Sequence, residues 1–311
     1  MEQQNKLDSK STKSGIVTGH VALLAANIIW GGMAPVSKDL LNMQLMSSWS
    51  LAGLRILGGA VLFWALSLIL PSSWVSDEKI EKKDFWQLCI ASLLVIAANQ
   101  ALVIIGMEYT SPVDATIVCS MTPIFTLILG ALFVHQKITW MKLIGVALGF
   151  AGVLAFIFAG ETNDAINVTN PLLGNAMCFL AQVCGACYLV FFTDIIKKYS
   201  AFTLMKWMFL ISAIVVFPFT IGGIIKVQWS EMPLGGMMDI LYIVVLATCL
   251  AYLFTPIGQK HVSPTVVAIY NYLQPVVAAV ISILAGLAII NWETALYACL
   301  IFVGVWLVSR N

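Results

Sequence analysis

One stretch of the sequence occurs twice at a constant separation. The Ser-Pro pair at 111–112 recurs at 263–264, and Pro123 recurs as Pro275, each 152 residues further along without a gap. Self-similarity of this kind is examined before any other pattern because it determines how the whole fold is assembled. The chain is therefore expected to contain two copies of one structural unit.

The composition places both copies in a membrane. Of the 311 residues, 60% are hydrophobic and only 10% are charged, whereas a soluble domain carries about 25% charged residues. Long apolar runs, each near the ~20 residues needed to cross a bilayer, alternate with short polar breaks. They predict an all-α membrane protein with ten transmembrane helices, at about 16–37, 47–70, 85–107, 112–134, 139–159, 171–193, 203–225, 234–258, 264–286 and 292–309.

The distribution of basic residues predicts the orientation. With the N-terminus inside, thirteen Lys and Arg residues fall in the inside segments, and only Lys38 and Lys226 fall in the outside ones. Positive residues in short loops stay in the cytoplasm, so both termini are expected there. The lipid bilayer is the expected environment. The net charge of +1 gives no reason to expect a nucleic-acid partner.

The predicted domains follow from the repeat. Residues 1–15 are expected to form a cytoplasmic tail, 16–160 the first five-helix repeat and 161–311 the second. Because each repeat has an odd number of spans, the second enters the membrane from the opposite side. Secondary transporters are commonly built from such inverted repeats, with the substrate site near the midplane between them.

Polar side chains at mid-membrane depth are the candidate substrate-binding residues. Asn27 and Trp30 share the first span, Gln182 matches Asn27 in the second repeat, and Tyr270 and Gln274 lie four residues apart on one helix face. The alternative is that such groups only join helices by hydrogen bonds. The predicted pocket comprises Asn27, Trp30, Asn99, Gln100, Gln182, Tyr188, Tyr252, Tyr270, Asn271 and Gln274.

Pro123 and Pro275 are the predicted hinges. A proline inside a helix removes one backbone hydrogen bond and bends the helix, and the alternative is a simple packing kink. Cys119 and Thr122 of the first copy take the places of Asn271 and Gln274. The repeat is therefore symmetric in shape but not in chemistry.

Several charged and polar residues have two interpretations each. Arg55, deep in the second span, could extend to the outer surface, bind an anion or pair with Asp239, which lies at a similar depth. Asp114 could cap a helix or bind an ion or proton. His20, His135 and His261 lie at predicted cytoplasmic span ends, where solvated histidine is the default.

Two spacing motifs have weaker functional interpretations. Cys184 and Cys187 have the spacing of a redox motif but lie inside a span, where small residues at a helix contact are the simpler explanation. Gly145 and Gly149 could serve packing within the bundle or dimerisation, so a monomer or a weak homodimer is expected.

No catalytic or cofactor motif is recognised. The sequence lacks a Gly-x-x-x-x-Gly-Lys phosphate loop, a His-Glu-x-x-His zinc motif and a Gly-x-Ser-x-Gly nucleophile motif. We therefore expect no cofactor, no metal and no enzymatic activity.

The sequence resembles the EamA-type exporters of the drug/metabolite transporter superfamily over residues 16–309. The resemblance depends on Asn27-x-x-Trp30-Gly31, on Arg55 within 54–59 and on the paired Ser-Pro helices. It implies a bacterial inner-membrane carrier, often an exporter of amino acids or related metabolites. The cavity it implies would be lined by Asn27, Trp30, Asn99, Tyr252, Tyr270 and Asn271.

The sequence departs from this family at one place. Members often end the fourth span with Gly-Glu, where this chain reads Val134-His135-Gln136-Lys137. Proton coupling therefore has no evident carrier, and facilitated diffusion or exchange is equally compatible. The expected function is a secondary transporter of small metabolites that works by alternating access. The alternatives are a channel or sensor without a transport cycle, a multidrug or organic cation carrier and an intramembrane enzyme.

Overall fold

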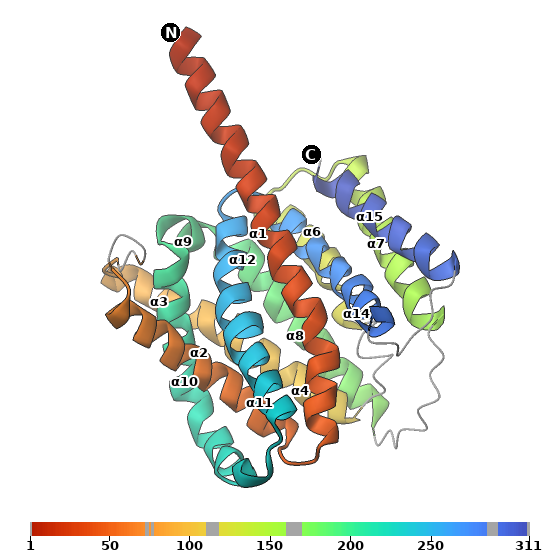
Figure 1. The fold of residues 1–311 in the computed structure, drawn as a ribbon. Coiled ribbons are helices and arrows are strands. Elements are labelled where there is room, and N and C mark those ends of the chain that lie inside the picture. Colours follow the sequence, from red (N-terminus) through yellow and green to blue (C-terminus); the bar gives the residue numbers. More distant parts are fainter. Residues whose placement is uncertain are drawn as a thin grey trace.

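The computed structural model describes residues 2–71, 75, 78–109, 118–159, 170–284 and 292–309. All regular structure in these residues is helical (Figure 1). The helices of the first half are α1 (Glu2–Asn42), α2 (Ser48–Ile69), α3 (Lys82–Ser92), the π-helix η1 (Leu93–Ala98), α4 (Asn99–Tyr109), α6 (Thr122–Phe133) and α7 (Trp140–Ala159).

The second half has the same order of long helices, again with short interruptions. Its elements are α8 (Pro171–Phe191), α9 (Thr193–Lys198), α10 (Ala201–Ile225), the 3-10 helix η2 (Trp229–Glu231), α11 (Leu234–Leu241), the π-helix η3 (Tyr242–Leu250), α12 (Ala251–Gln259), α13 (Pro264–Ile269), the 3-10 helix η4 (Tyr270–Tyr272), α14 (Leu273–Leu284) and α15 (Trp292–Ser309).

Six helical segments are long and apolar enough to cross a membrane. They are Ser14–Met33, Ser48–Ile69, Lys82–Val103, Leu172–Phe191, Ala201–Ile225 and Leu234–Gln259. Helical structure occurs in every predicted span, but α6, the apolar part of α7 and that of α15 are shorter than 18 residues. The chain is thus a multi-pass helical membrane protein, and the count of ten crossings stays a prediction.

The two halves exchange their first helices. α1 packs against α12 and α14 of the second half, and α8 packs against α4 and α6 of the first. Two further pairs of equivalent helices contact each other directly, α2 with α10 and α7 with α15. In Figure 1, α1 and α8 run in opposite directions, as do α2 and α10. The first half is therefore repeated upside down, and its core is shared with the second.

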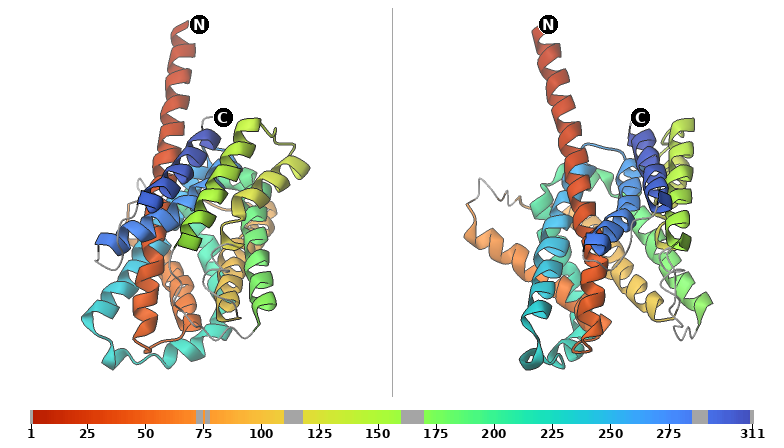
Figure 2. Two further views of the ribbon diagram at one scale, coloured as in Figure 1. Left: turned by 90° about the vertical axis from the view of Figure 1, so that its right-hand side faces the viewer. Right: turned by 45° about the vertical axis from the view of Figure 1, so that its right-hand side comes forward.

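The first helix extends well beyond the bundle. α1 begins at Glu2, so residues 2–15 of the predicted tail continue the helix of the first span. Figure 2 shows this extension projecting on the side where α15 ends. We call this side of the molecule the terminal face.

Both halves contain a π-helical segment at the same register. η1 ends at Ala98 and η3 ends at Leu250, and the next amide in each, of Asn99 and of Ala251, bonds the carbonyl five residues back. Short π segments inside α-helices widen the helix locally and occur often at functional sites. Hydropathy alone does not predict them, because the apolar pattern continues through both segments.

The predicted hinge prolines follow helix breaks rather than simple kinks. The 3-10 helix η4 separates α13 from α14 just before Pro275. In the first half, residues 120–121 form a turn and α6 starts at Thr122, one residue before Pro123. Ser263 is the N-cap of α13, although its side chain does not bond to the helix. Ser111, Pro112 and Asp114 lie outside the described residues.

The glycine-rich face of α7 is covered by α15 of the same chain. A Cβ added at Gly304 would lie 2.6 Å from the Gly145 carbonyl oxygen and 2.7 Å from the Gly149 nitrogen. Backbones can approach this closely only where side chains are absent, as at small-residue contacts between membrane helices. The packing interpretation of these glycines is therefore correct. Dimerisation through this face is not compatible with the structure.

Candidate functional site

Gln100 and Tyr252 mark the axis that relates the two halves. They are 152 residues apart, so each occupies the other's position in the repeat, and Gln100 Nε2 donates to the Tyr252 hydroxyl at 2.9 Å. Two equivalent residues can contact each other only where the axis passes between them. Each also lies just after the π-helix of its own half, so this bond joins the two helices that directly follow the π segments.

A first amide cluster joins α1 to α14. Gln274 Nε2 donates to Asn27 Oδ1 at 2.9 Å and, more weakly, to Asn271 Oδ1 at 3.4 Å. Asn27 is 1% exposed, and its own amide nitrogen donates to the Leu23 carbonyl. Gly31 permits this contact, because a Cβ there would lie 2.9 Å from the Gln274 carbonyl oxygen.

A second cluster occupies the equivalent place in the other half. The Thr122 hydroxyl donates to Gln182 Oε1 at 2.6 Å, and Gln182 Nε2 donates to Cys119 Sγ at 3.3 Å. In the repeat, Gln182 corresponds to Asn27, while Thr122 and Cys119 take the places of Gln274 and Asn271. The same contact between halves therefore occurs twice. The amide of the first helix bonds to another amide in one case, and to a hydroxyl and a thiol in the other.

Trp30 and Asn99 each bind a backbone carbonyl across the halves. Trp30 Nε1 donates to the Ala247 carbonyl in η3 at 2.8 Å, and its ring meets that of Tyr252 edge-on at 5.2 Å between centroids. Asn99 Nδ2 donates to the Ala181 carbonyl at 2.7 Å. The counterpart of Trp30 is Gly185, where an added Cβ would approach only Asn99, at 3.4 Å. The indole therefore has no equivalent on the other side of the axis.

Arg55 is buried beside this centre, at 9% exposure. Its Nε donates to Thr248 Oγ1 at 3.3 Å, and Thr248 donates onward to the Ile243 carbonyl within η3. The predicted ion pair with Asp239 does not form. Arg55 contacts Thr248, and Asp239 lies roughly 13 Å from Thr248 along the same helix, at 1.5 Å per residue. The charged group that interacts with Asp239 is instead the Asp39 carboxylate.

Tyr270 and Tyr188 have hydrogen-bond partners outside the axis cluster. The Tyr270 hydroxyl is 2.8 Å from His20 Nδ1, which lies two turns before Asn27 on α1. His20 is therefore a half-buried partner of the candidate site, not the solvated histidine that the sequence suggested. The Tyr188 hydroxyl donates to Gln259 Oε1 at 3.2 Å, a contact within the second half.

Most of these side chains share one property, which is that they join the two halves. Apart from Tyr188, which bonds to Gln259, and Asn271, which contacts Gln274 of its own half, each residue of the predicted pocket has a hydrogen-bond contact across the interface. The contacts are His20–Tyr270, Asn27–Gln274, Trp30–Ala247, Arg55–Thr248, Asn99–Ala181, Gln100–Tyr252 and Thr122–Gln182.

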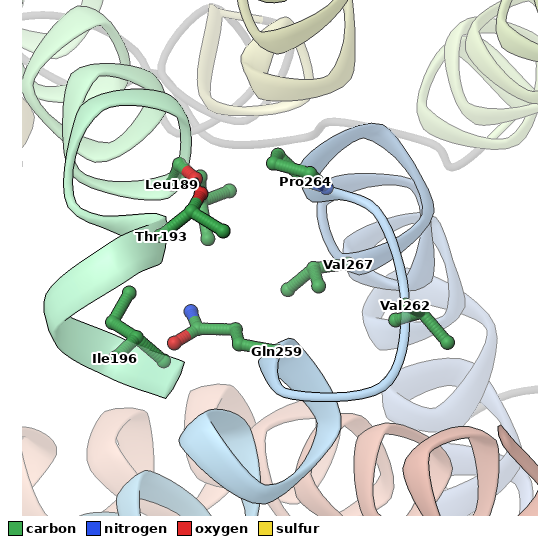
Figure 3. Close-up of a pocket in the computed structure, with 7 residues that line it drawn as sticks. All are labelled: Leu189, Thr193, Ile196, Gln259, Val262, Pro264 and Val267. Atoms are coloured by element: carbon green, nitrogen blue, oxygen red, sulfur yellow. Dashed lines mark hydrogen bonds between the residues drawn. The ribbon is translucent and has the colours of Figure 1, made fainter. Parts of the chain in front are cut away.

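A cleft with both polar and apolar walls, which the sequence did not indicate, opens on the terminal face. Its volume is about 620 Å³, and it lies between the end of α6, the α8–α9 junction and the loop from α12 to α13. Lys197, Lys260 and His261 contribute to its lining, as does Asp194. The basic residues had served only to predict orientation, because a loop position does not reveal what a side chain faces. A niche of about 10 Å³ that includes Gln259 adjoins the cleft (Figure 3).

Ion pairs join the halves on another part of the same face. Lys198 Nζ lies 2.7 Å from Glu81 Oε1 and also bonds to Asp84. The hydrogen bond from Lys198, with a second from Lys83, holds the pKa of the Glu81 carboxyl below its usual range. The Asp84 and Glu81 carboxylates correspondingly raise the pKa of Lys198. These contacts connect α9 to the segment that leads into α3.

Apolar helices in two inverted copies, with hydrogen-bonded polar groups between them, define a membrane transporter of the inverted-repeat class. The chain belongs to the EamA-like transporter family, whose model matches residues 17–158 and again residues 172–310. Both copies of the repeat are therefore EamA units.

Similar proteins support the same class. The chain is 25% identical over 289 residues to the uncharacterized transporter YyaM of Bacillus subtilis, covering 92% of each chain. It is 24% identical to an uncharacterized transporter of Archaeoglobus fulgidus, covering 93% of this chain and 98% of that one. A WAT1-related protein of Arabidopsis thaliana, At3g53210, is 22% identical over 71% of this chain and 68% of its own.

The fold also matches a solved structure. A protein crystal structure with 15% sequence identity superposes with a TM-score of 0.76 and covers 95% of this chain and 96% of its own. At this level of identity the match supports the fold alone.

Proposed function

We propose that this protein is a secondary transporter that exports a small metabolite, an amino acid or a related compound, by alternating access between its two halves. The carrying observation is that the polar residues expected to line a pocket hold the halves together by hydrogen bonds. Groups that bind each other in one state are available to a substrate when the halves separate. The family and its relatives support transport in general.

The central site would offer a zwitterion both kinds of partner. The amides of Asn27, Gln274 and Gln100 supply donors and acceptors without net charge, and Trp30 and Tyr252 supply aromatic surface. Arg55 supplies a buried positive charge beside them and is the candidate partner of a substrate carboxylate. A hydrophobic pocket with few converging polar groups is the usual form of a small-molecule site.

The interrupted helices are the proposed moving parts. The breaks before Pro123 and Pro275 occur at the same register in both halves. Discontinuous helices at the interface between repeats are common in secondary transporters, where one repeat rocks against the other. We assign the hinges to these two breaks.

The proposed topology has ten crossings, with both termini in the cytoplasm of a bacterial inner membrane. Lys79, Lys83, Lys137, Lys197 and Lys260 lie in segments expected on the same side of the membrane as the termini, and the positive-inside rule assigns such a side to the cytoplasm. The repeats would meet near residues 160–161. The proposed carrier works as a monomer without a cofactor and is not an enzyme.

Counterflow in proteoliposomes tests this function. Vesicles loaded with unlabelled amino acids should accelerate the uptake of the same labelled amino acid, because a carrier returns faster when occupied, whereas a channel shows no such stimulation. Alanine at Asn27, Trp30 or Asn271 should each abolish counterflow in protein that still folds.

A matched control is Gln228→Ala, an exposed glutamine between α10 and η2 that is not among the residues of the candidate site. It should keep the wild-type rate. Wild-type counterflow in all three site variants would eliminate the proposed site, and wild-type protein without trans-stimulation by any amino acid would eliminate the carrier function.

A further inference from the structure

Gln259 is a buried amide with one half unsatisfied. The side chain is 5% exposed, its Oε1 accepts from the Tyr188 hydroxyl at 3.2 Å, and its Nε2 has no acceptor among the described residues. A buried donor left unpaired loses its bonds to water without replacement and destabilises the folded protein. Native proteins rarely retain such a group unless something absent from the polypeptide binds it.

The unpaired nitrogen faces the niche next to the cleft. Figure 3 shows the Gln259 amide extending toward Thr193 and Ile196 from the end of α12. The other walls are mainly apolar, with Leu189 and Val267 among them. The volume of about 10 Å³ admits about one oxygen-sized group. The niche is therefore too small and too apolar for a hydrated cation.

The cleft provides room for the rest of a ligand. It shares Thr193, Val262 and Pro264 with the niche, and its volume of about 620 Å³ is within the usual range for small-molecule sites, about 300–1,000 Å³. Lys197 and Lys260 line it, and within the described ranges neither has a carboxylate at salt-bridge distance.

We infer that niche and cleft form a first binding site for a carboxylate-bearing solute on the terminal face. One carboxylate oxygen accepts from Gln259 Nε2 in the niche, the lysines of the cleft balance its charge, and the remainder of the solute occupies the cleft. Tyr188 is a positioning residue, because its hydroxyl occupies Oε1 and turns Nε2 toward the niche. The inference rests on the proposed function, in which this site precedes the central one.

Binding of the smallest carboxylate tests the site without any assumption about the solute's side chain. The probes are potassium acetate and acetamide, which share their shape and differ in charge, at constant ionic strength with the full chain in detergent micelles. Saturation-transfer NMR should detect acetate bound more tightly than acetamide. Gln259→Glu, which has the same shape and adds a negative charge, should weaken acetate at least tenfold and acetamide much less.

Two further variants keep the result interpretable. Gln228→Glu adds the same charge at an exposed position outside the cleft and should leave acetate binding unchanged. Gln259→Leu removes the donor and fills the niche and should also abolish acetate binding. A more stable Gln259→Leu protein with undiminished acetate binding would mean that the niche holds ordered water only, which overturns the inference.

Equal binding of acetate and acetamide, or wild-type acetate binding by Gln259→Glu, would also overturn the inference of a first binding site. Counterflow separates this inference from the proposed function. If Gln259→Glu shows counterflow with an unchanged half-saturation concentration of the solute, the first binding site is refuted and the carrier function is retained. Acetate binding that requires Gln259, in a protein without counterflow, would support the site and reject the carrier.

Discussion

The contact between Asn27 and Gln274 makes the clearest energetic prediction. Replacing Asn27 by leucine removes the acceptor at 2.9 Å and leaves Gln274 Nε2 with only the 3.4 Å contact to Asn271. Hydrogen bonds between membrane helices average about 0.6 kcal/mol and reach about 1.7 kcal/mol. Since Asn27 is 1% exposed, water cannot replace the lost partner, and we expect a coupling near the upper part of this range.

A double-mutant cycle measures that coupling. The four proteins are wild type, Asn27→Leu, Gln274→Leu and the double variant, unfolded by SDS in mixed micelles and followed by tryptophan fluorescence. We expect an interaction free energy of about 1–1.5 kcal/mol. The equivalent cycle on Thr122 and Gln182, joined at 2.6 Å, should give a similar value.

The control cycle combines Gln274→Leu with Ser67→Ala, because the Ser67 hydroxyl bonds only locally, to the Trp64 carbonyl. Distant sites without shared partners add to within about 0.3–0.5 kcal/mol. A coupling between Asn27 and Gln274 no larger than the control would refute the idea that this amide pair holds the halves together. About 1 kcal/mol corresponds to roughly a five-fold shift between two states, so transport rates should respond as well.

Two further predictions concern the packing and the terminal face. Gly304→Val should prevent the close contact of α7 and α15 and destabilise the protein by about 1–3 kcal/mol or more, which a lower melting temperature would show. The control is Gly222→Ala, which should not destabilise the protein because nothing lies within 4 Å of the added Cβ. Equal melting temperatures for the two variants would contradict the packing of α7 against α15. Glu81 has a lowered pKa in the folded protein, so its stabilisation is present above the ordinary pKa of glutamate and lost as the pH falls through the folded value. The difference in melting temperature between wild type and Glu81→Gln should therefore vanish in acid. The control variant Glu231→Gln, which removes an exposed carboxylate, should show no such pH-dependent difference. A difference in melting temperature between wild type and Glu81→Gln that persists in acid would exclude the ion pairs as its cause.

The sequence predicted the helical segments well, because apolar length and basic loops are local properties. The equivalence of Gln182 and Asn27 could also be predicted from the sequence, because a repeat aligns corresponding positions. The structure adds that the two residues make equivalent contacts with Thr122 and Gln274. The functional role of this set stays a prediction.

Other features were not predictable, for two physical reasons. The π segments leave the apolar pattern intact, so nothing marks the residue at which Asn99 bonds five positions back. Side-chain depth along a tilted helix is also poorly defined by sequence, which is why Arg55 and Asp239 looked like partners. His20 looked like a surface residue because its partner, Tyr270, lies 250 positions away.

The hydrogen bond between Gln100 and Tyr252 has a consequence for how such a chain can arise. In a dimer of identical five-helix subunits, a residue on the two-fold axis faces its own copy, so glutamine would meet glutamine, or tyrosine would meet tyrosine. Here the Gln100 amide faces the Tyr252 hydroxyl, and two different residues at equivalent positions require that each position is encoded separately. Joining both copies in one polypeptide makes that pairing accessible to mutation, and the centre of this molecule is a place where the fused copies have diverged in sequence while remaining in contact.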